Sequence, residues 1–408
     1  MAEISECDVA IVGGGMVGAT LACILAKGGV SVGLFDFREP EREWDNDSID
    51  LRVSALTLAS QNIFDALDIW RSMVKKGVSP YRQMRVWDFE GVGELNFDGA
   101  DAGLDVMGHI VENRVTIAAL WESLEQLSTV SIFCPARITG LQRFDEFAVL
   151  CLDDGRTIKT QLIVGADGRS SAIRDLAGIK VGGWSYKQDA LVTTVSISEN
   201  HRQTAYQRFL PTGPLAFLPL LNGDCSIVWS ADTEKTKGNM ALAKEDFLVA
   251  LEDASAGMVG KIKAVGQRVS FPLGLQFAKR YTDERVALIG DAIHAVHPLA
   301  GQGANLGLLD AAALGELVLK AHNQQLSLSS HHVLRRYERW RKGDNFAMLG
   351  ALDVLKRTYG ISFSPLNKAR ALGMNLINTT LPAKNYFNRY AMGLRKGLPG
   401  LAYGKPCW

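Results

Sequence analysis

Short runs of apolar residues, each ending at a glycine or a carboxylate, recur along the chain. The runs Asp8–Val12, Val30–Phe35, Leu162–Val164 and Val286–Ile289 are mostly apolar, which is typical of buried strands. The first of them is followed by the apolar helical pattern Ala19–Lys27. This succession of strand, glycine turn and helix predicts an α/β fold with a Rossmann-like sheet.

A different pattern, with shorter strand-like segments between Gly, Pro and Asn turns, extends from about Gly178 to Lys279. Strands are expected at Ala190–Ile197, Tyr206–Leu210, Leu215–Leu220, Cys225–Ser230 and Val269–Leu273. A helical segment, Ala243–Met258, interrupts them. We interpret this region as an inserted, mostly antiparallel sheet. Its large apolar residues are expected either to fill a core or to line a ligand cavity, and they are Phe209, Phe217, Leu218, Trp229 and Phe271.

Helical periodicity dominates the last part of the chain. Helices are expected from Asp310 to about His322 and from Val333 to about Thr358, and an apolar helical pattern continues from Ser364 to Trp408. The second helix carries a basic series, which we interpret as a solvated face, with a site for anionic lipid or phosphate as the alternative. This series comprises Arg335, Arg336, Arg339, Arg341 and Lys342.

These patterns divide the chain of 408 residues into three units. The predicted nucleotide-binding domain is discontinuous and comprises 1–75, 105–180 and 280–325. The predicted sheet domain comprises 76–104 and 181–279, and the predicted helical region is 326–408.

Composition narrows the class of protein. Apolar residues make up 47 % and charged residues 22 %, as in globular enzymes, and the formal net charge of zero argues against nucleic acid as a partner. The six cysteines contain no C-x-x-C pair, which favours reduced thiols over disulfides or a zinc site. No apolar run is long enough to cross a bilayer, and the first strand begins too early to leave room for a signal peptide. We therefore expect a cytoplasmic protein.

The first strand leads into G-x-G-x-x-G, formed by Gly13, Gly15 and Gly18, and the second strand ends at Asp36. In this arrangement the glycines permit a tight turn close to a pyrophosphate, and the acid reaches the adenosine ribose. An acid at this position favours a free 2′-hydroxyl, as in FAD or NAD. Arg52 follows at the start of a segment that leads into a helix ending near Trp70, and its guanidinium is expected either to clamp a phosphate or to lie at the surface.

Two further strands also end in an acid. Leu162–Val164 leads to Asp167, which is expected either to cap the next helix or to take part in the nucleotide site. Val286–Ile289 leads to Asp291, and a loop with Gly301, Gly303 and Gly307 then precedes the next helix. The amides of that loop suit a pyrophosphate or an electron-rich ring, so the reactive ring of the dinucleotide is expected near His297–Pro298. A metal site at His294 and His297 is the weaker alternative, because no third ligand is apparent.

The three signatures, Gly13 to Asp36, GADGRSSAIR and RVALIGDAIHAVHPLAGQGANLGLLD, resemble the group A FAD-dependent aromatic hydroxylases, which have the p-hydroxybenzoate hydroxylase fold. The segments DLRVSAL and GHIVENRV resemble the ubiquinone-biosynthesis hydroxylases within that group, and the 2-polyprenylphenol hydroxylases are the most similar members. The resemblance covers essentially the whole chain. Asp36 stands where many relatives have Glu, and Ile293 stands where Ala is usual; neither departure removes a needed group.

The resemblance implies a set of cofactor contacts. It places the three glycines at the pyrophosphate, Asp36 at the ribose, Arg52 and Arg114 near the phosphates and adenine, and Asp291 at the ribityl chain and pyrophosphate. The cofactor-binding residues it implies are Gly13, Gly15, Gly18, Asp36, Arg52, Arg114, Asp167, Asp291, Pro298, Gly301, Gly303, Ala304 and Asn305. The last four are implied to form a loop against the isoalloxazine ring. No catalytic base and no metal are implied.

The resemblance further implies an FAD-dependent monooxygenase, an oxidoreductase that hydroxylates a polyprenylated phenol in ubiquinone biosynthesis through a C4a-hydroperoxyflavin. NAD(P)H would be a transient co-substrate, since a second G-x-G-x-x-G is absent, and O₂ the other. Other ubiquinone-biosynthesis proteins, peripheral contact with the inner membrane and a homo-oligomer are compatible with this family. The alternatives are a flavin enzyme acting on a small soluble phenol or an isoprenoid double bond, a NAD-dependent dehydrogenase, and a non-catalytic scaffold.

Overall fold

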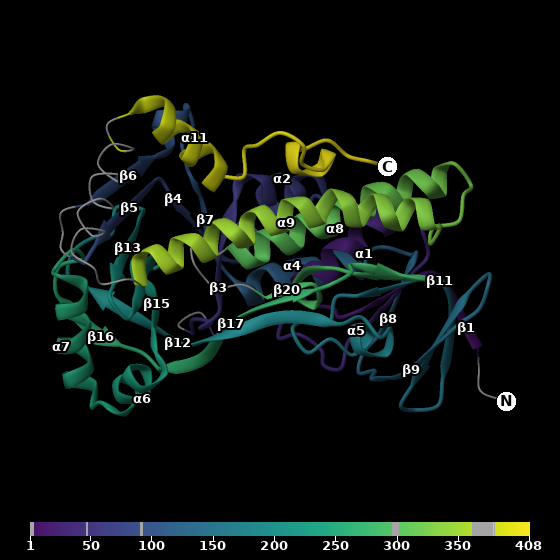
Figure 1. The fold of residues 1–408 in the computed structure, drawn as a ribbon, viewed down its shortest axis with the longest axis horizontal. Coiled ribbons are helices and arrows are strands. Elements are labelled where there is room, and N and C mark those ends of the chain that lie inside the picture. The colour runs from purple at the N-terminus through teal and green to yellow at the C-terminus, as the bar shows by residue number, and fades with distance from the viewer. Residues whose placement is uncertain (1–3, 46–47, 90–92, 296–301, 361–377, 379) are drawn as a thin grey trace.

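The computed structural model describes residues 4–408 except 46–47, 90–92, 296–301, 361–377 and 379. Two large sheets lie side by side, and the long helix α9 (His331–Gly360) extends along both of them (Figure 1). Helix α8 (Gln302–Asn323) lies beside α9 over the first sheet. The predicted α/β fold, with an inserted and mostly antiparallel sheet and a C-terminal helical segment, is confirmed.

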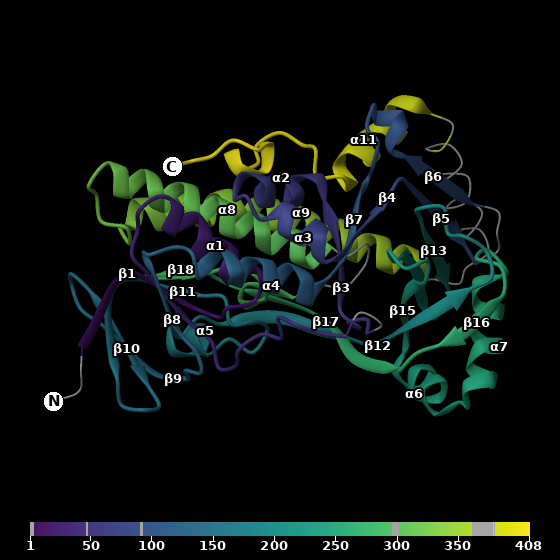
Figure 2. The same ribbon diagram turned by 180° about the vertical axis from the view of Figure 1, so that it is seen from behind.

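The first sheet is the predicted Rossmann-like sheet, and the neighbouring pairs from β19 to β8 are parallel. Its central residues are buried because helices cover it: α1 (Met16–Lys27) packs between α4 (Asn113–Leu124) and α8, and Figure 2 shows α1 and α4 from behind. In spatial order the strands are β18 (Thr282–Asp283), β19 (Val286–Leu288), β11 (Thr157–Gly165), β1 (Ile4–Val12), β2 (Val32–Phe35) and β8 (Val130–Phe133), with β10 (Ala148–Leu152) beside β11 and β9 (Ile138–Arg143) beside β10.

The second sheet is antiparallel except for the parallel pair β5–β13. Phe217 and Trp229 are buried with Phe247 of α7 in its core, so these two aromatics fill a core rather than line a cavity. The strands, in order, are β20 (His294–Ala295), β17 (Val269–Ala278), β12 (Val181–Ile197), β15 (Cys225–Asp232), β14 (Gly213–Pro219), β13 (Thr204–Leu210), β5 (Gln83–Asp88) and β6 (Glu94–Asp98). Strand β16 (Ile262–Val265) pairs with β12. Helices α6 (Thr233–Ala241) and α7 (Lys244–Ser255) pack on this sheet.

A third, three-stranded sheet, β3 (Val53–Thr57), β7 (Gly108–Glu112) and β4 (Val78–Tyr81), lies between the other two. The predicted single helix ending near Trp70 is wrong. Two helices are present, α2 (Leu58–Ala66) and α3 (Trp70–Gly77). They are separate because Asp68 adopts a φ of 62°, a left-handed conformation that ends a right-handed helix.

The described residues 380–408 are less helical than the sequence pattern predicts. They contain α11 (Leu381–Ala391) and a 3₁₀ turn, Gly400–Tyr403, and residues 361–377 and 379 lie outside the described part. The short helix α5 (Ala172–Leu176) follows β11, as expected for a helix after Asp167. Within the described ranges, no helix has both the length and the apolar character needed to cross a bilayer.

Candidate functional site

The predicted site residues follow the carboxyl ends of adjacent parallel strands. The register pairs Val12 with Phe35 and with Gly165, and Gly165 with Leu288, so that β2, β1, β11 and β19 end at the same edge. Asp36 and Asp291 therefore follow the two outer strands of this set, and these strands lie roughly 14 Å apart at about 4.8 Å per strand spacing. In open α/β sheets, ligands bind along this edge. The structure thus brings the three sequence signatures to one edge of the sheet.

The glycine turn is built for the close approach of a ligand. Gly13 has a φ of 108°, and a Cβ there would lie 2.3 Å from the carbonyl oxygen of Ala166. A Cβ on Gly18 would lie 1.9 Å from the carbonyl oxygen of Gly13, so both glycines are needed for the turn itself. Gly15 differs, because a Cβ there would meet open space.

The open space at Gly15 coincides with the start of α1. Gly15 is the N-cap residue of this helix and has no side chain that could accept hydrogen bonds from the first helical amides. The indole Nε1–H of Trp121 donates to the Gly14 carbonyl at 2.7 Å and so fixes the turn. Uncapped amides and the positive end of a helix dipole attract an anion. The residues present therefore fit the pyrophosphate of a dinucleotide such as FAD.

Asp36 is tied directly to this turn. Its Oδ2 accepts a hydrogen bond from the Gly14 amide at 2.6 Å, and its Oδ1 accepts one from the Arg38 amide at 3.3 Å. The carboxylate is thus fixed beside the glycine turn, at the end of β2.

Asp167 caps a helix. Its Oδ1 accepts from the Ser171 hydroxyl at 2.5 Å and its Oδ2 from the Ile173 amide at 3.1 Å, at the start of α5. Burial raises the pKa of this carboxyl, and these hydrogen bonds partly offset the rise. The first of the two sequence interpretations is therefore observed, and a cofactor contact of Asp167 remains a prediction.

Asp291 lies in the 3₁₀ turn Gly290–Ala292, which joins β19 to β20. Although its side chain reaches solvent, the crowding of protein around it raises its pKa, and the nearby His294, Arg169 and Arg52 act in the opposite direction. Arg52 and Asp291, separated by most of the sequence, are therefore close enough to interact electrostatically. The Arg52 guanidinium lies over the Phe271 ring of β17, 5.3 Å from its centroid. Arg169 interacts with Asp291 in the same way, and the sequence analysis did not identify it as a candidate.

Arg114 is fully engaged with its own surroundings. Its Nε donates to Glu112 at 2.8 Å, one terminal nitrogen donates to the Ser48 hydroxyl at 2.9 Å, and the guanidinium lies 4.6 Å from the centroid of the Trp44 ring. It fixes the segment around Ser48, and its predicted contact with the phosphates or adenine remains a prediction.

The predicted glycine loop is a helix in its described part. Helix α8 begins at Gln302, so Gly303, Ala304 and Asn305 form its first turn, and Gly307 also lies within it; the prediction of a loop through Gly307 is wrong. The reason is helix packing: a Cβ on Gly307 would lie 2.6 Å from a methyl group of Val17 in α1. Pro298 and Gly301 lie outside the described residues.

Asn305 fixes the start of α8 against β3 and α2. Its Oδ1 accepts from the Thr57 amide at 2.9 Å and from the Ser60 hydroxyl at 2.7 Å, and its Nδ2 donates to the Ala55 carbonyl at 2.8 Å. The sequence contains no signal for these contacts, because the partners are separated by more than two hundred residues.

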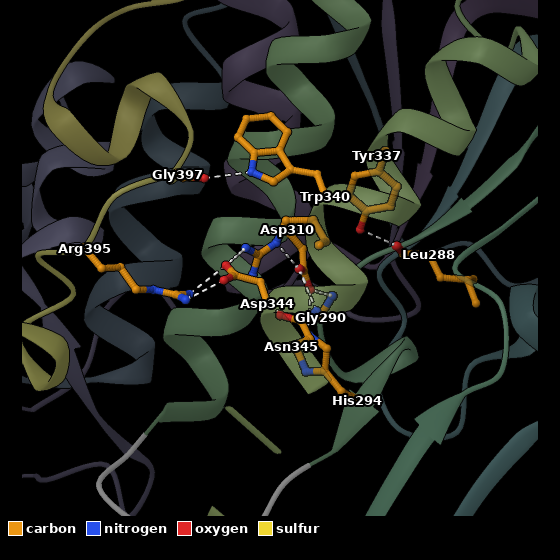
Figure 3. Close-up of polar contacts among 11 residues, drawn as sticks. Leu288, Gly290, His294, Asp310, Tyr337, Trp340, Asp344, Asn345, Arg395 and Gly397 are labelled. Carbon is orange, nitrogen blue, oxygen red and sulfur yellow. Dashed lines mark hydrogen bonds and ion pairs between the residues drawn. The ribbon is translucent and has the colours of Figure 1, made fainter. Parts of the chain in front are cut away.

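A buried polar cluster around Asp310 contacts Gly290, in the turn that carries Asp291 (Figure 3). Asp310 of α8 pairs with Arg341 of α9 at 2.8 Å, and both side chains are 0 % exposed. The prediction of a solvated face is therefore wrong for Arg341. His294 also pairs with Asp310, at 2.7 Å, and no cluster of three metal-ligating side chains occurs in the part of the chain that the structure describes.

Comparison with known proteins gives matches over most of the chain. The family model described as an FAD binding domain matches residues 6–343. Ubiquinone hydroxylase UbiL of Rhodospirillum rubrum is 40 % identical over 389 residues, covering 95 % of this chain and 90 % of that protein. The 3-demethoxyubiquinol 3-hydroxylase of Escherichia coli is 35 % identical, with 95 % and 98 % covered. The human ubiquinone biosynthesis monooxygenase COQ6 is 33 % identical, with 94 % and 92 % covered.

Solved structures support the same fold. PqsL of Pseudomonas aeruginosa has a TM-score of 0.76 at 24 % identity, covering 91 % of this chain and 99 % of that one. The p-nitrophenol 4-monooxygenase PnpA of Pseudomonas putida has a TM-score of 0.78 at 18 % identity, with 97 % and 99 % covered. With FAD as its cofactor, the chain belongs to the family of ubiquinone-biosynthesis hydroxylases within the flavin monooxygenases.

Proposed function

We propose that this monooxygenase hydroxylates the ring of a polyprenylated phenol in ubiquinone biosynthesis. The observation that carries this proposal is the match, over at least 94 % of the chain, to three proteins whose names place them in ubiquinone hydroxylation or biosynthesis. Bound FAD, reduced by NAD(P)H, supplies the activation of O₂ for transfer of one oxygen atom to the ring. The protein's part is to bind, to orient and to exclude water.

We assign the cofactor contacts as follows. Gly13, Gly15 and the start of α1 bind the pyrophosphate, Asp36 binds the adenosine ribose, and Asp291 binds the ribityl chain. The open space at Gly15 and the uncapped amides of α1 support the first assignment. The positions of both acids on one sheet edge support the other two.

An apolar region between the second and third sheets is our candidate for the prenyl chain. Tyr81, Met107, Ile110 and Leu220 are buried there, and partly buried apolar residues such as Ile49 pack against them. A cavity of about 280 Å³ next to this region has a mixed lining, with Ile49, Ile110 and Leu220 on its apolar part and Lys76 and Glu112 among its polar residues. Contact of the cytoplasmic enzyme with the inner membrane surface, where such a substrate resides, forms part of the same proposal.

The proposal is tested with the purified, FAD-loaded enzyme. Incubation with NADH or NADPH, ¹⁸O₂ and a 2-polyprenylphenol should give a product that carries one ¹⁸O atom, detected by mass spectrometry. Turnover should fall when the prenyl chain is shortened or removed. Equal or faster turnover of the unprenylated phenol would favour the soluble-substrate alternative, and flavin binding without any product would favour the scaffold.

Arg52 is expected to contribute to FAD binding through charge. Replacement Arg52→Met retains apolar contact with Phe271 but removes the guanidinium charge near Asp291, so the Kd for FAD should rise roughly 10-fold, as for loss of a hydrogen bond to a charged group. Titration of flavin fluorescence measures this effect, which should shrink at 1 M salt because of screening. Arg156→Met, at a surface arginine paired with Asp154, is the control and should leave the Kd unchanged. An unchanged Kd in Arg52→Met would contradict the assignment.

A further inference from the structure

Four residues form a continuous series of alternating charges, which we call the charge chain: Asp310, Arg341, Asp344 and Arg395. Arg341 donates through Nε to Asp310 Oδ1 at 2.8 Å and through a terminal nitrogen to Asp344 Oδ2 at 2.6 Å. Arg395 binds both oxygens of Asp344, one of them at 2.7 Å. Figure 3 shows the contacts that lead from Arg395 through Asp344 and Asp310 to Gly290, which precedes Asp291 in the turn.

The inner end of the charge chain holds the Asp291 turn. Asp310 Oδ2 accepts hydrogen bonds from the Gly290 amide at 3.3 Å and from His294 Nε2 at 2.7 Å, on the two sides of Asp291. Gly290 has a φ of 61°, so the turn depends on a left-handed backbone conformation at that residue. Asp310 thus fixes both flanks of the residue assigned to the cofactor.

Helix α9 supports the same turn at two further points. The Tyr337 hydroxyl donates to the Leu288 carbonyl at 2.8 Å, at the end of β19. Asn345 donates to Asp310 Oδ1 at 3.1 Å and accepts from Arg341 at 2.8 Å. The position of α9 and the position of the Asp291 turn are therefore linked by direct contacts.

The outer end of the charge chain belongs to the C-terminal segment, which lies along α8 and α9 (Figure 1). Arg395 brings the segment to α9, and Trp340 Nε1 donates to the Gly397 carbonyl at 2.8 Å. The Tyr403 hydroxyl donates to the Arg395 carbonyl at 2.6 Å, and the Gly400 amide donates to Glu316 of α8 at 2.9 Å. These contacts give Arg395 a defined position.

The charge chain is buried where it meets the cofactor turn, so its members depend on each other. Burial opposes ionisation of Asp310, but His294 and Arg341 outweigh it and hold the pKa of Asp310 below its ordinary value. Asp310 and Arg341 are both 0 % exposed, and removal of one partner from a buried ion pair leaves the other uncompensated. Loss of Arg395 leaves Asp344 to compete with Asp310 for Arg341, and this competition loosens the support of the turn.

We propose that Arg395 is a positioning residue of the flavin site, and that it acts through Asp344, Arg341 and Asp310 on the Asp291 turn. By linkage, docking of the C-terminal segment and binding of FAD then strengthen each other by the same factor. This proposal concerns the cofactor alone, so its outcome is independent of which phenol the enzyme hydroxylates.

The experiment compares Arg395→Met with Lys384→Met. Lys384 lies on α11 and pairs with Asp101 at 2.7 Å. The two ion pairs are similarly exposed, with side-chain exposures of 16 % and 29 % for Lys384–Asp101 and of 17 % and 23 % for Arg395–Asp344. The Arg395–Asp344 pair is connected to Asp310 through Arg341, whereas the Lys384–Asp101 pair is not part of the charge chain. Titration of apoprotein with FAD should show a Kd raised roughly 10-fold in Arg395→Met and by less than roughly 2-fold in Lys384→Met. Arg395→Lys should give an intermediate Kd, since it keeps the charge and loses the bidentate contact.

A double-mutant cycle with Asp291→Asn tests the route. If Arg395 acts through the turn, Arg395→Met should raise the Kd much less in the Asp291→Asn background than in the wild type. Hydrogen exchange of residues 395–403 should also slow when FAD binds to the wild-type protein. Equal Kd values for Arg395→Met and Lys384→Met, or an undiminished effect of Arg395→Met in the Asp291→Asn background, would overturn the proposal. Melting temperatures of the apoproteins show whether either variant is merely unfolded.

Discussion

Gly13→Ala is expected to weaken FAD binding by at least roughly 100-fold, the largest effect among the substitutions considered. The φ of 108° is strained for any residue with a Cβ, and the added methyl would lie 2.3 Å from the Ala166 carbonyl oxygen. Relief of this contact requires the glycine turn and the 166–167 segment to separate, and this movement opens the edge at which the pyrophosphate binds. The measurement is the flavin content of the purified protein together with the Kd of its apoprotein for FAD.

Gly155→Ala is the matched control for this substitution. Gly155 has a φ of 86°, but a Cβ there would meet open space, and the residue lies in the turn before β11. It therefore carries backbone strain without the clash, and it should lower the melting temperature slightly while leaving FAD bound. A Gly13→Ala protein that purifies yellow with one FAD per chain would contradict the role assigned to this turn.

Asp291→Asn is expected to change cofactor affinity and apoprotein stability in opposite directions. Loss of the charged acceptor should raise the Kd for FAD by roughly 10- to 100-fold. Close protein surroundings raise the pKa of Asp291 although its side chain reaches solvent, so its ionised form is penalised in the apoprotein and the neutral amide is not. The melting temperature of the apoprotein at pH 7 should therefore rise slightly, because screening by solvent keeps the penalty small.

The pH dependence of this gain follows from the direction of the shift. Because the folded-state pKa is raised, the penalty exists where the carboxyl is ionised, above the folded-state pKa, and it disappears below about pH 4, where Asp291 is protonated in both states. The two apoproteins should then melt alike at low pH. Asp154→Asn, at an exposed carboxylate whose pKa is lowered by Arg156, should show no such gain at pH 7. A lower melting temperature for Asp291→Asn at pH 7 would contradict this account.

Local signals in the sequence were sufficient for the Rossmann-like unit. The glycines at 13, 15 and 18 and the acid at 36 lie within one strand–helix–strand unit, whose elements contact each other directly. The fold class followed from these residues and from two similar strand ends, and the segments DLRVSAL and GHIVENRV indicated the family. The strands that precede Asp36 and Asp291 end at the same sheet edge.

Contacts between distant segments could not be predicted. Arg341 carries no mark that distinguishes it from Arg339, yet α8 supplies Asp310 as its buried partner. Gly303 and Gly307 were predicted to lie in a loop because glycine is a poor helix former. Both lie in α8 instead, and close packing against Val17 explains why a glycine stands within the helix at position 307. The Arg395–Asp344 pair joins a residue that precedes α11 in the sequence to one that follows it. Helical periodicity contains no information about such a contact.

The order of strands in the first sheet also constrains biosynthesis of the holoenzyme. The sheet edge assigned to the cofactor includes both β1, which ends at Val12, and β19, which ends at Leu288, with β11 between them. At about 5–20 residues per second, the ribosome completes β19 on the order of tens of seconds after β1. Until then the nascent chain exposes an incomplete parallel sheet, and flavin can be incorporated stably only late in translation or after it.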